Sequence, residues 1–185
     1  MRDYAVELEQ RIAFIQKAVA AAGCTGIVYG NSGGKDSALA GILCKKALAD
    51  TVGVILPCSS KRNYGADMDD GLEVAQQFEI ETRTVDLTPV REQLLRALEG
   101  VTVPNADALA NIAPRLRMTT LYAIAASENR LVAGTGNRSE VYMGYFTKWG
   151  DGGHDFNPIA DLTAVSYTHL RRGQGPHGGP ALRRL

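Results

Sequence analysis

A glycine- and hydroxyl-rich stretch at residues 30–37 contains the residue types that bind phosphate. It follows a β-branched apolar run at 25–29 and precedes an apolar-periodic segment at 36–49, an order that predicts strand, tight loop and helix. Adjacent glycines let the backbone approach a ligand, and the N–H groups at a helix start attract anions. We therefore predict a phosphate-binding loop made of Gly30, Asn31, Ser32, Gly33, Gly34, Lys35, Asp36 and Ser37, in which Asp36 can hold a cation.

The spacing in this stretch excludes two common nucleotide loops. The G-x-x-x-x-G-K-[ST] loop needs Ser or Thr directly after Lys, whereas Asp36 follows Lys35 here. The dinucleotide pattern G-x-G-x-x-G does not occur, because Gly30, Gly33 and Gly34 are spaced differently. The hexapeptide Ser-Gly-Gly-x-Asp-Ser resembles instead the pyrophosphate loop of N-type ATP pyrophosphatases, which adenylate a substrate. The alternative is an ordinary glycine-rich turn.

Length and composition indicate one globular domain. The chain has 185 residues, 45% of them hydrophobic and 22% charged, and its formal net charge is zero. We therefore expect neither a nucleic acid nor a membrane as partner. No apolar run reaches the ~20 residues that span a bilayer, and the start lacks an apolar signal segment. Three cysteines without metal-ligand spacing fit reduced thiols, so we expect a cytoplasmic protein.

The order of periodic segments predicts the fold. We expect helices at 3–22, 36–49, 66–78 and 88–99, and strands at 25–29, 52–57 and 80–86, with a polar loop at 58–65 over the site. Such alternation predicts an α/β fold, a doubly wound parallel sheet with helices on both faces. Ligands of such folds lie beyond the carboxyl ends of the strands, where the loop at 30–37 falls.

Pro114 predicts where a long helix begins. Proline is tolerated at the first helical position, so we expect a helix from about Pro114 to Glu128. Arg115 and Arg117 would then lie in its first turn, against the helix dipole. This placement suggests an anionic partner; a solvated face or an ion pair is the alternative.

Two further polar segments follow. Residues 131–134 predict a short strand, and 134–140 a second polar loop at a carboxyl end. Residues 144–155 are glycine-rich and mix lysine, aspartate and aromatic side chains, which is typical of a substrate loop. A plain connector is the alternative.

Four stretches in order resemble NAD synthetases, and the resemblance covers roughly residues 1–163. They are Gly-Asn-Ser-Gly-Gly-Lys-Asp-Ser at 30–37, Asn-Ile-Ala-Pro-Arg-Leu-Arg-Met at 111–118, Gly-Thr-Gly-Asn-Arg-Ser-Glu at 134–140 and Phe-Thr-Lys-Trp-Gly-Asp-Gly-Gly-His-Asp-Phe-Asn-Pro at 146–158. The first is shared with GMP synthetases and tRNA-modifying relatives, whereas the other three are more specific. The resemblance implies an ammonia-dependent ligase that adenylates deamido-NAD with ATP and then forms the amide.

The resemblance also implies roles for single residues. Residues 30–37 and Thr135 match positions that bind ATP, and Asp36 and Glu140 match the ligands of Mg²⁺. Arg115, Lys148 and Asp155 match positions that bind deamido-NAD. Family members are homodimers, and we expect the same here. No glutamine-hydrolysing domain precedes Met1, so we expect free ammonia as the nitrogen source.

The chain departs from the family pattern after Thr163. The family has an ATP-contacting lysine at the next position, where this chain has Ala164, and residues 164–185 form a basic Gly/Pro/Arg tail that we expect to be disordered. We therefore assign 1–163 to a C-terminally truncated ATP pyrophosphatase domain and 164–185 to an atypical tail, which we interpret as the product of a truncated or mis-assembled reading frame. A natural basic tail is the alternative. Two alternatives stay open: a truncated, inactive ATP-binding fragment, and another N-type ATP pyrophosphatase such as a tRNA-thiolating enzyme, against which residues 148–158 argue.

Overall fold

Strand β1 (Gly26–Gly30) lies inside a parallel sheet whose strand order is β3-β2-β1-β4. Strand β1 pairs with β2 (Thr51–Ile55) on one side and with β4 (Arg130–Ala133) on the other, and β3 (Glu81–Thr84) pairs with the far side of β2. The computed structural model describes residues 3–59 and 66–168. Because β2 and β4 flank β1, the connections after β1 and β4 diverge, which opens a crevice at the carboxyl ends of these two strands.

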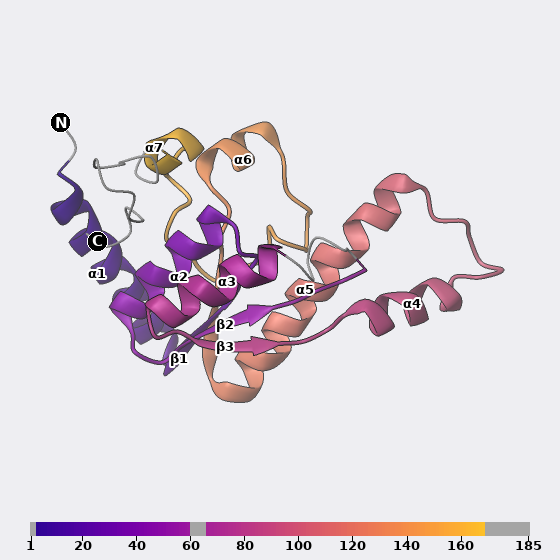
Figure 1. Cartoon of the computed structure of the whole chain (residues 1–185), viewed down its shortest axis with the longest axis horizontal. Coiled ribbons are helices and arrows are strands. Elements are labelled where there is room, and N and C mark those ends of the chain that lie inside the picture. The colour runs from indigo at the N-terminus through magenta and orange to yellow at the C-terminus, as the bar shows by residue number, and fades with distance from the viewer. Residues whose placement is uncertain (1–2, 60–65, 169–185) are drawn as a thin grey trace.

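Helices cover both faces of this sheet (Figure 1). The described helices are α1 (Tyr4–Ala22), α2 (Lys35–Ala47), α3 (Ala66–Gln77), α4 (Thr88–Ala97), α5 (Ala106–Glu128), α6 (Arg138–Met143) and α7 (Ala164–Thr168). Successive side chains of β1 point to opposite faces. Tyr29 packs with α1 and α2 in one apolar cluster, and Val28 packs with Leu121 and Ala125 of α5 in the other. The predicted α/β fold is thereby confirmed.

Most predicted elements match the observed ones. Between residues 3 and 99 the ends of the predicted helices and strands differ from the observed ends by no more than two residues. The predicted strand at 131–134 is β4. Of the predicted loop at 58–65, residues 60–65 lie outside the described residues.

The predicted helix start at Pro114 is wrong. Helix α5 begins at Ala106, where the side chain of Asn105 accepts a 2.9 Å hydrogen bond from the backbone N–H of Ala108, and Pro114 lies inside the helix. A proline there removes the bond to the carbonyl four residues earlier, that of Ala110. Both residues line the larger cavity described below, so the interruption lies on the open side of the helix. Arg115 is therefore not in a first turn, and the argument from the helix dipole fails.

Two segments expected to be irregular contain short helices. Asn137 and Glu140 form a capping box that starts α6 within the predicted loop at 134–140. Residues 164–168 form α7, so the expected disorder is wrong for them, whereas 169–185 lie outside the described residues.

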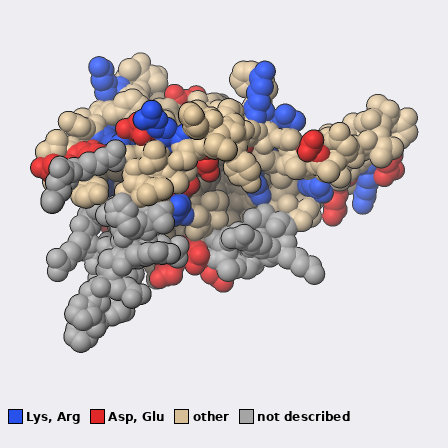
Figure 2. All heavy atoms as spheres, turned by 90° about the horizontal axis from the view of Figure 1, so that it is seen from above, with Lys and Arg blue, Asp and Glu red and all other residues tan. Residues whose placement is uncertain are grey.

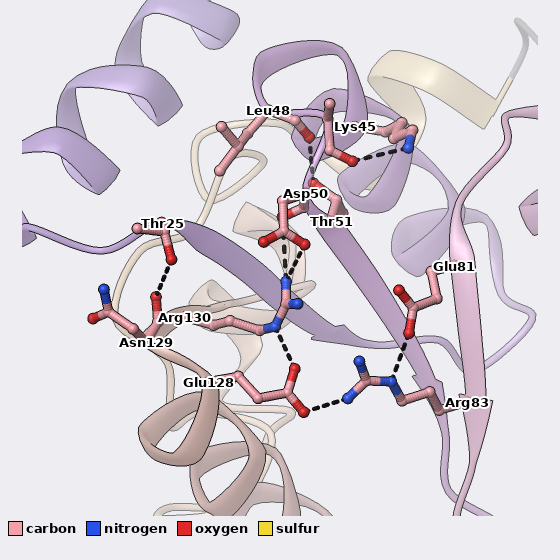
Figure 3. A network of polar contacts seen from close by, with 11 residues as sticks. Thr25, Lys45, Leu48, Asp50, Thr51, Glu81, Arg83, Glu128, Asn129 and Arg130 are labelled. Carbon is pink, nitrogen blue, oxygen red and sulfur yellow. Dashed lines mark hydrogen bonds and ion pairs between the residues drawn. The ribbon is translucent and has the colours of Figure 1, made fainter.

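A network of ion pairs lies at the amino ends of the strands, at the end of the sheet opposite the crevice (Figure 3). Arg130 on β4 binds Glu128 at 2.7 Å and Asp50 at 2.6 Å, and Glu128 also binds Arg83 on β3. The Arg130 side chain is 9% exposed, so it has little freedom to leave its partners. The network connects β4, β3 and the start of β2 at the end of the sheet away from the crevice.

The surface carries both signs of charge. In Figure 2 the lysine and arginine side chains are interspersed with aspartate and glutamate on the face that is shown, and no single sign dominates. Helix α4, the loop after it and the first turns of α5 extend beyond the sheet (Figure 1). They expose apolar side chains, among them Val90 on α4 and Val101 and Val103 in the loop. Among the described residues no helix is long and apolar enough to cross a membrane.

Candidate functional site

The loop between β1 and α2 is shaped by two buried polar side chains. Asn31 donates from Nδ2 to the carbonyl of Gly71 at 3.0 Å and accepts from the N–H of Gly33 at 3.2 Å. The hydroxyl of Ser37 donates to the carbonyl of Gly34 at 2.9 Å. Gly33 has a φ of +76°, a conformation that other residues rarely adopt. These contacts hold the loop against α3 and the first turn of α2.

The start of α2 is open to a ligand. Its N-cap residue, Gly34, makes no side-chain capping bond. The first N–H groups of a helix have no acceptor within the helix, and together with the helix dipole they favour an anion. By contrast, the N–H groups of Ser32 and Gly34 bond the hydroxyls of Ser37 and Ser32 at 3.3 Å. A phosphate at this loop would therefore meet the N–H groups of the first helical turn more readily than those of the loop itself.

The two candidate metal ligands lie around one asparagine. Asn137 is 2% exposed, and its Nδ2 donates to Oδ2 of Asp36 at 3.0 Å. Its backbone N–H donates to Oε2 of Glu140 at 2.8 Å. Asp36 comes from the start of α2 and Glu140 from the first turn of α6, so the loops after β1 and β4 meet at this residue. The two carboxylates thus lie at the same end of the sheet.

Two neighbouring cavities open at this end of the sheet. The larger has a volume of about 990 Å³ and lies between the carboxyl ends of the strands and α5; its apolar walls include Val54, Leu56 and Leu121. The smaller has a volume of about 420 Å³ and is lined by Lys35, Asp36, Ser37 and Glu140, among others. Of the residues predicted to bind ATP, those that line one or both cavities are Gly30, Asn31, Ser32, Gly34, Lys35, Asp36, Ser37 and Thr135, whereas Gly33 lines neither.

The three residues expected to bind deamido-NAD lie outside both cavities. Nε of Arg115 on α5 donates to the carbonyl of Lys148 at 3.3 Å, so these two residues are neighbours. Asp155 accepts from the hydroxyl of Tyr122, seven residues after Arg115 on the same helix, at 3.0 Å. It also accepts from the N–H of Val132 at 2.8 Å. The three residues therefore follow the exposed side of α5, next to the cavities.

Several residues at the site were not expected from the sequence. Asn137 is followed three residues later by a glutamate, a capping pattern that was available as a signal. Arg117 was singled out with Arg115 for an anionic partner but was given no site. It lines the larger cavity and donates from Nε to the carbonyl of Leu56 at 2.9 Å, and burial lowers its pKa. Tyr167 donates to Asp36 at 2.9 Å from a segment that was expected to be disordered, and nothing in the sequence pattern pointed to it.

Other titratable groups near the site are held neutral. Burial lowers the pKa of His154, which lines the smaller cavity, while Asp155 partly opposes this shift. Burial, followed by the hydrogen bond to Asp36, raises the pKa of the Tyr167 hydroxyl. Burial also raises the pKa of the Cys58 thiol, so a thiolate is disfavoured there. These groups can donate or accept hydrogen bonds but carry little charge near neutral pH.

Comparisons with known proteins identify the family. The family model for NAD synthase matches residues 7–175. A curated NH3-dependent NAD+ synthetase from Carboxydothermus hydrogenoformans is 42% identical over 167 residues, which cover 89% of this chain and 68% of that protein. The corresponding protein from Pyrobaculum aerophilum is 43% identical over 160 residues, which cover 85% of this chain and 59% of that protein. The chain thus spans about two thirds of the length of these relatives.

Solved structures give the same result. The structure of NMN synthetase from Francisella tularensis has a TM-score of 0.85 and 33% identity, over 93% of this chain and 71% of that one. The NH3-dependent NAD synthetase from Campylobacter jejuni, in complex with nitrate, has a TM-score of 0.82 and 32% identity, over 93% and 73% of the two chains. The family match extends past Thr163 into the segment that contains α7. Motifs, fold and comparisons agree, and the chain belongs to the NAD synthase family.

Proposed function

We propose that the chain amidates deamido-NAD with ammonia, consumes ATP and releases AMP and pyrophosphate. The nicotinate carboxylate attacks the α-phosphate of ATP and pyrophosphate leaves; ammonia then attacks the acyl carbon and AMP leaves. Membership of the NAD synthase family supports this reaction. The single observation that carries it is the 3.0 Å hydrogen bond from Asn137 to Asp36, because it joins the phosphate-binding loop to the loop after β4 in one site.

ATP would occupy both cavities. The larger one is at the upper end of the usual range for a small-molecule pocket and has apolar walls, so it suits the adenosine. The smaller one is bordered by the start of α2, whose N–H groups suit the phosphates. Thr135 lines both cavities, which supports a contact near the α-phosphate. Positioning and charge stabilisation would then provide the rate enhancement, with no covalent enzyme intermediate.

Asp36 and Glu140 would hold Mg²⁺. Carboxylate oxygens are the hard ligands that this ion prefers, and the two side chains share Asn137 as a hydrogen-bond partner. In the part of the chain that the structure describes, no three His, Cys, Asp or Glu residues form a metal-binding group. The donor set therefore suits an ion that takes its remaining ligands from water and substrate phosphates, as Mg²⁺ commonly does. Bound there, Mg²⁺ would neutralise charge on the departing pyrophosphate.

Deamido-NAD would bind along the exposed side of α5. Arg115 and Lys148 supply positive charge for its phosphates, and Asp155 supplies a hydrogen-bond acceptor. Asp155 is tied to Tyr122 and to the backbone of Val132, which fixes its position. The surface here is open, and Tyr145 and Trp149 are 80% and 67% exposed, so a planar ring could stack on them.

A second copy of the chain would complete this open site. The arm formed by α4, the loop after it and the first turns of α5 projects from the sheet and exposes Val90, Leu94, Val101 and Val103. Apolar side chains gathered on one projection favour burial in an interface, so we propose a homodimer. We further propose that the enzyme acts in the cytoplasm with free ammonia, and that neither nucleic acid nor membrane is a partner.

Three alternatives remain to be tested. The similarity to an NMN synthetase favours the same amidation on a mononucleotide as the second candidate. An inactive ATP-binding fragment and a tRNA-thiolating enzyme remain from the sequence alternatives, and the family match does not favour them.

AMP release distinguishes these possibilities. The chain is incubated with Mg²⁺, ATP and ammonium, together with deamido-NAD or nicotinate mononucleotide, and in a separate reaction with Mg²⁺, ATP, tRNA and sulfide. AMP is quantified in each reaction. The proposal predicts AMP only with deamido-NAD, in a 1:1 ratio with NAD by balance of the reaction. AMP release with the mononucleotide alone would favour the second candidate, and nucleotide binding without AMP in any reaction would favour the fragment.

A further inference from the structure

The imidazole of His154 packs on the backbone just after β4 and borders the smaller cavity. A Cβ added at Gly134 would lie 2.6 Å from Cγ and 2.7 Å from Nδ1 of this ring, so glycine leaves the room that the ring occupies. Nδ1 is buried, and among the described residues it has no hydrogen-bond partner. Because Cγ, Nδ1 and Cδ2 are the ring atoms nearest Gly134, Nε2 lies at the far end of the ring, toward the cavity.

The segment that carries His154 is held beside β4. The backbone N–H of Asp155 donates to the carbonyl of Val132 at 2.9 Å, and the N–H of Gly134 donates to the carbonyl of Phe156 at 2.8 Å. The carboxylate of Asp155 also accepts from the N–H of Val132 at 2.8 Å. These bonds surround an isolated parallel bridge between this segment and the end of β4. The imidazole is therefore attached to backbone that the sheet holds in place.

The ring presents an N–H group to the cavity. Burial lowers the pKa of His154, with partial opposition from Asp155, so the imidazole is neutral near neutral pH and carries one proton on its two nitrogens. A proton on Nδ1 would be buried without an acceptor, an arrangement that is rare in native structures, so the proton belongs on Nε2. Protonation of the second nitrogen would leave the N–H at Nε2 in place. The donor therefore does not depend on whether the ring titrates.

The ligand that suits this donor is an anion and not a metal ion. A metal ion needs a free lone pair on Nε2, and in the described part of the chain His154 forms no metal-binding group with two other His, Cys, Asp or Glu residues. Gly134 lines the larger cavity, and His154, which packs on it, lines the smaller one. Thr135, the next residue, lines both. The donor thus lies where the two cavities meet, which is the place that the proposed function gives to the α-phosphate of ATP.

We propose that His154 is a nucleotide-binding residue, and that its Nε2–H donates a hydrogen bond to an oxygen of the α-phosphate of ATP. The inference rests on the proposed function, because it takes the two cavities as the ATP site. Charge on the α-phosphate oxygens is redistributed when the carboxylate attacks, so a donor fixed at this position would also favour the adenylation step. The opposite possibility is that the imidazole only fills the space above Gly134, in which case an apolar side chain of similar size would serve equally well.

Two variants separate the N–H group from the volume of the ring. His154→Gln keeps an N–H donor near the position of Nε2, whereas His154→Leu fills similar space without a donor. Isothermal titration with Mg²⁺ measures the affinity for the α,β-methylene analogue of ATP, which cannot be cleaved between these phosphates, and for inorganic pyrophosphate. Thermal unfolding verifies that each variant is folded. Nitrogen-15 NMR of the wild type reports which ring nitrogen carries the proton, and the signals of His154 are those that His154→Gln lacks among the three histidines of the chain.

We expect the proton on Nε2, and a change in the Nε2 chemical shift when the analogue binds. Affinity for the analogue should fall about tenfold in His154→Leu, because a hydrogen bond to a charged group is lost, and should stay near the wild-type value in His154→Gln. Affinity for pyrophosphate should be unchanged in both variants. A proton on Nδ1, equal losses in both variants, or an equal loss for pyrophosphate would overturn the inference.

The same titrations distinguish failure of the inference from failure of the proposed function. If the wild type binds the analogue and His154→Leu binds it equally well, the role of His154 is wrong and the ATP site stands. If the wild type does not bind the analogue, the ATP site of the proposed function is wrong, and the role of His154 falls with it.

Discussion

The side-chain amide of Asn137 donates a 3.0 Å hydrogen bond to the carboxylate of Asp36, across a separation of 101 residues in the chain. Asn137 starts α6 after β4, and Asp36 lies in the first turn of α2 after β1. The two strands are neighbours in the sheet, so this bond connects the two loops that border the crevice at their carboxyl ends. One residue therefore both caps a helix and orients a carboxylate of the site.

These two roles of Asn137 can be separated. Asn137→Ala removes the cap and the bond to Asp36, so we expect a loss of about 1 kcal/mol of unfolding free energy together with lower activity. Asn137→Ser keeps a capping hydroxyl but cannot reach Asp36 as the amide does, so we expect near wild-type stability and the same loss of activity. Urea unfolding and AMP release measure the two effects. Full activity in Asn137→Ser would show that the contact with Asp36 is dispensable.

Arg115 should affect one substrate and not the other. It lies beside Lys148 and outside both cavities, so we expect Arg115→Ala to raise KM for deamido-NAD and to leave KM for ATP unchanged. A hydrogen bond to a charged group contributes about 1.5–3 kcal/mol, which corresponds to roughly a 10- to 100-fold rise. Lys17→Ala, on the exposed side of α1, is the control. A rise in KM for ATP of the same size would contradict the separation of the two sites.

The buried hydroxyl of Tyr29 should reduce stability. The ring is fully buried, and among the described residues the hydroxyl has no hydrogen-bond partner. A buried polar group without a partner is costly, so Tyr29→Phe should raise the unfolding free energy by about 1 kcal/mol. Tyr122→Phe is the contrasting variant: its hydroxyl donates to Asp155, and we expect a decrease. Equal losses in both variants by urea unfolding would refute the account of Tyr29.

The ion pairs of Glu128 should make stability depend on pH. The hydrogen bonds from Arg83 and Arg130 lower the pKa of the Glu128 carboxyl below its ordinary value of 4.5. A carboxyl with a lowered pKa stabilises the fold above its unfolded-state pKa, and this contribution is lost as the pH falls through the folded-state value. Glu128→Gln should therefore be less stable than the wild type at pH 7, with a difference that shrinks below pH 4.5. The pairs are partly exposed, so 1 M NaCl should also reduce the difference. A difference that does not depend on pH would indicate packing instead of charge.

The sequence predicted the fold through its local patterns. The β-branched runs around Val28 and Val54, and the apolar periodicity of the intervening helices, identify elements that bury one side or both. The glycines and serines at 30–37 were sufficient to place a ligand loop at a strand end. These signals are local, and tertiary contacts reinforce them.

The errors arose where tertiary contacts override a local rule. Proline usually lies at the start of a helix or interrupts one, so Pro114 predicted a helix start. In the structure Asn105 caps α5 earlier in the chain, and the turn that Pro114 interrupts faces the larger cavity. The Asn137–Asp36 bond joins distant segments, and only a model of the strand order brings them together. The roles of Thr135, Arg115, Lys148 and Asp155 stay predictions.

The most direct measurement of the central claim is the yield of AMP and NAD from deamido-NAD, ammonium and ATP with Mg²⁺, compared between the wild type, Asp36→Asn and Glu140→Gln. The account predicts equal amounts of AMP and NAD in the wild type. Loss of an electrostatic group at a transferring phosphate typically lowers kcat by about 100- to 1,000-fold, so both variants should fall by that order. Wild-type turnover in either variant, or AMP without NAD in the wild type, would contradict it.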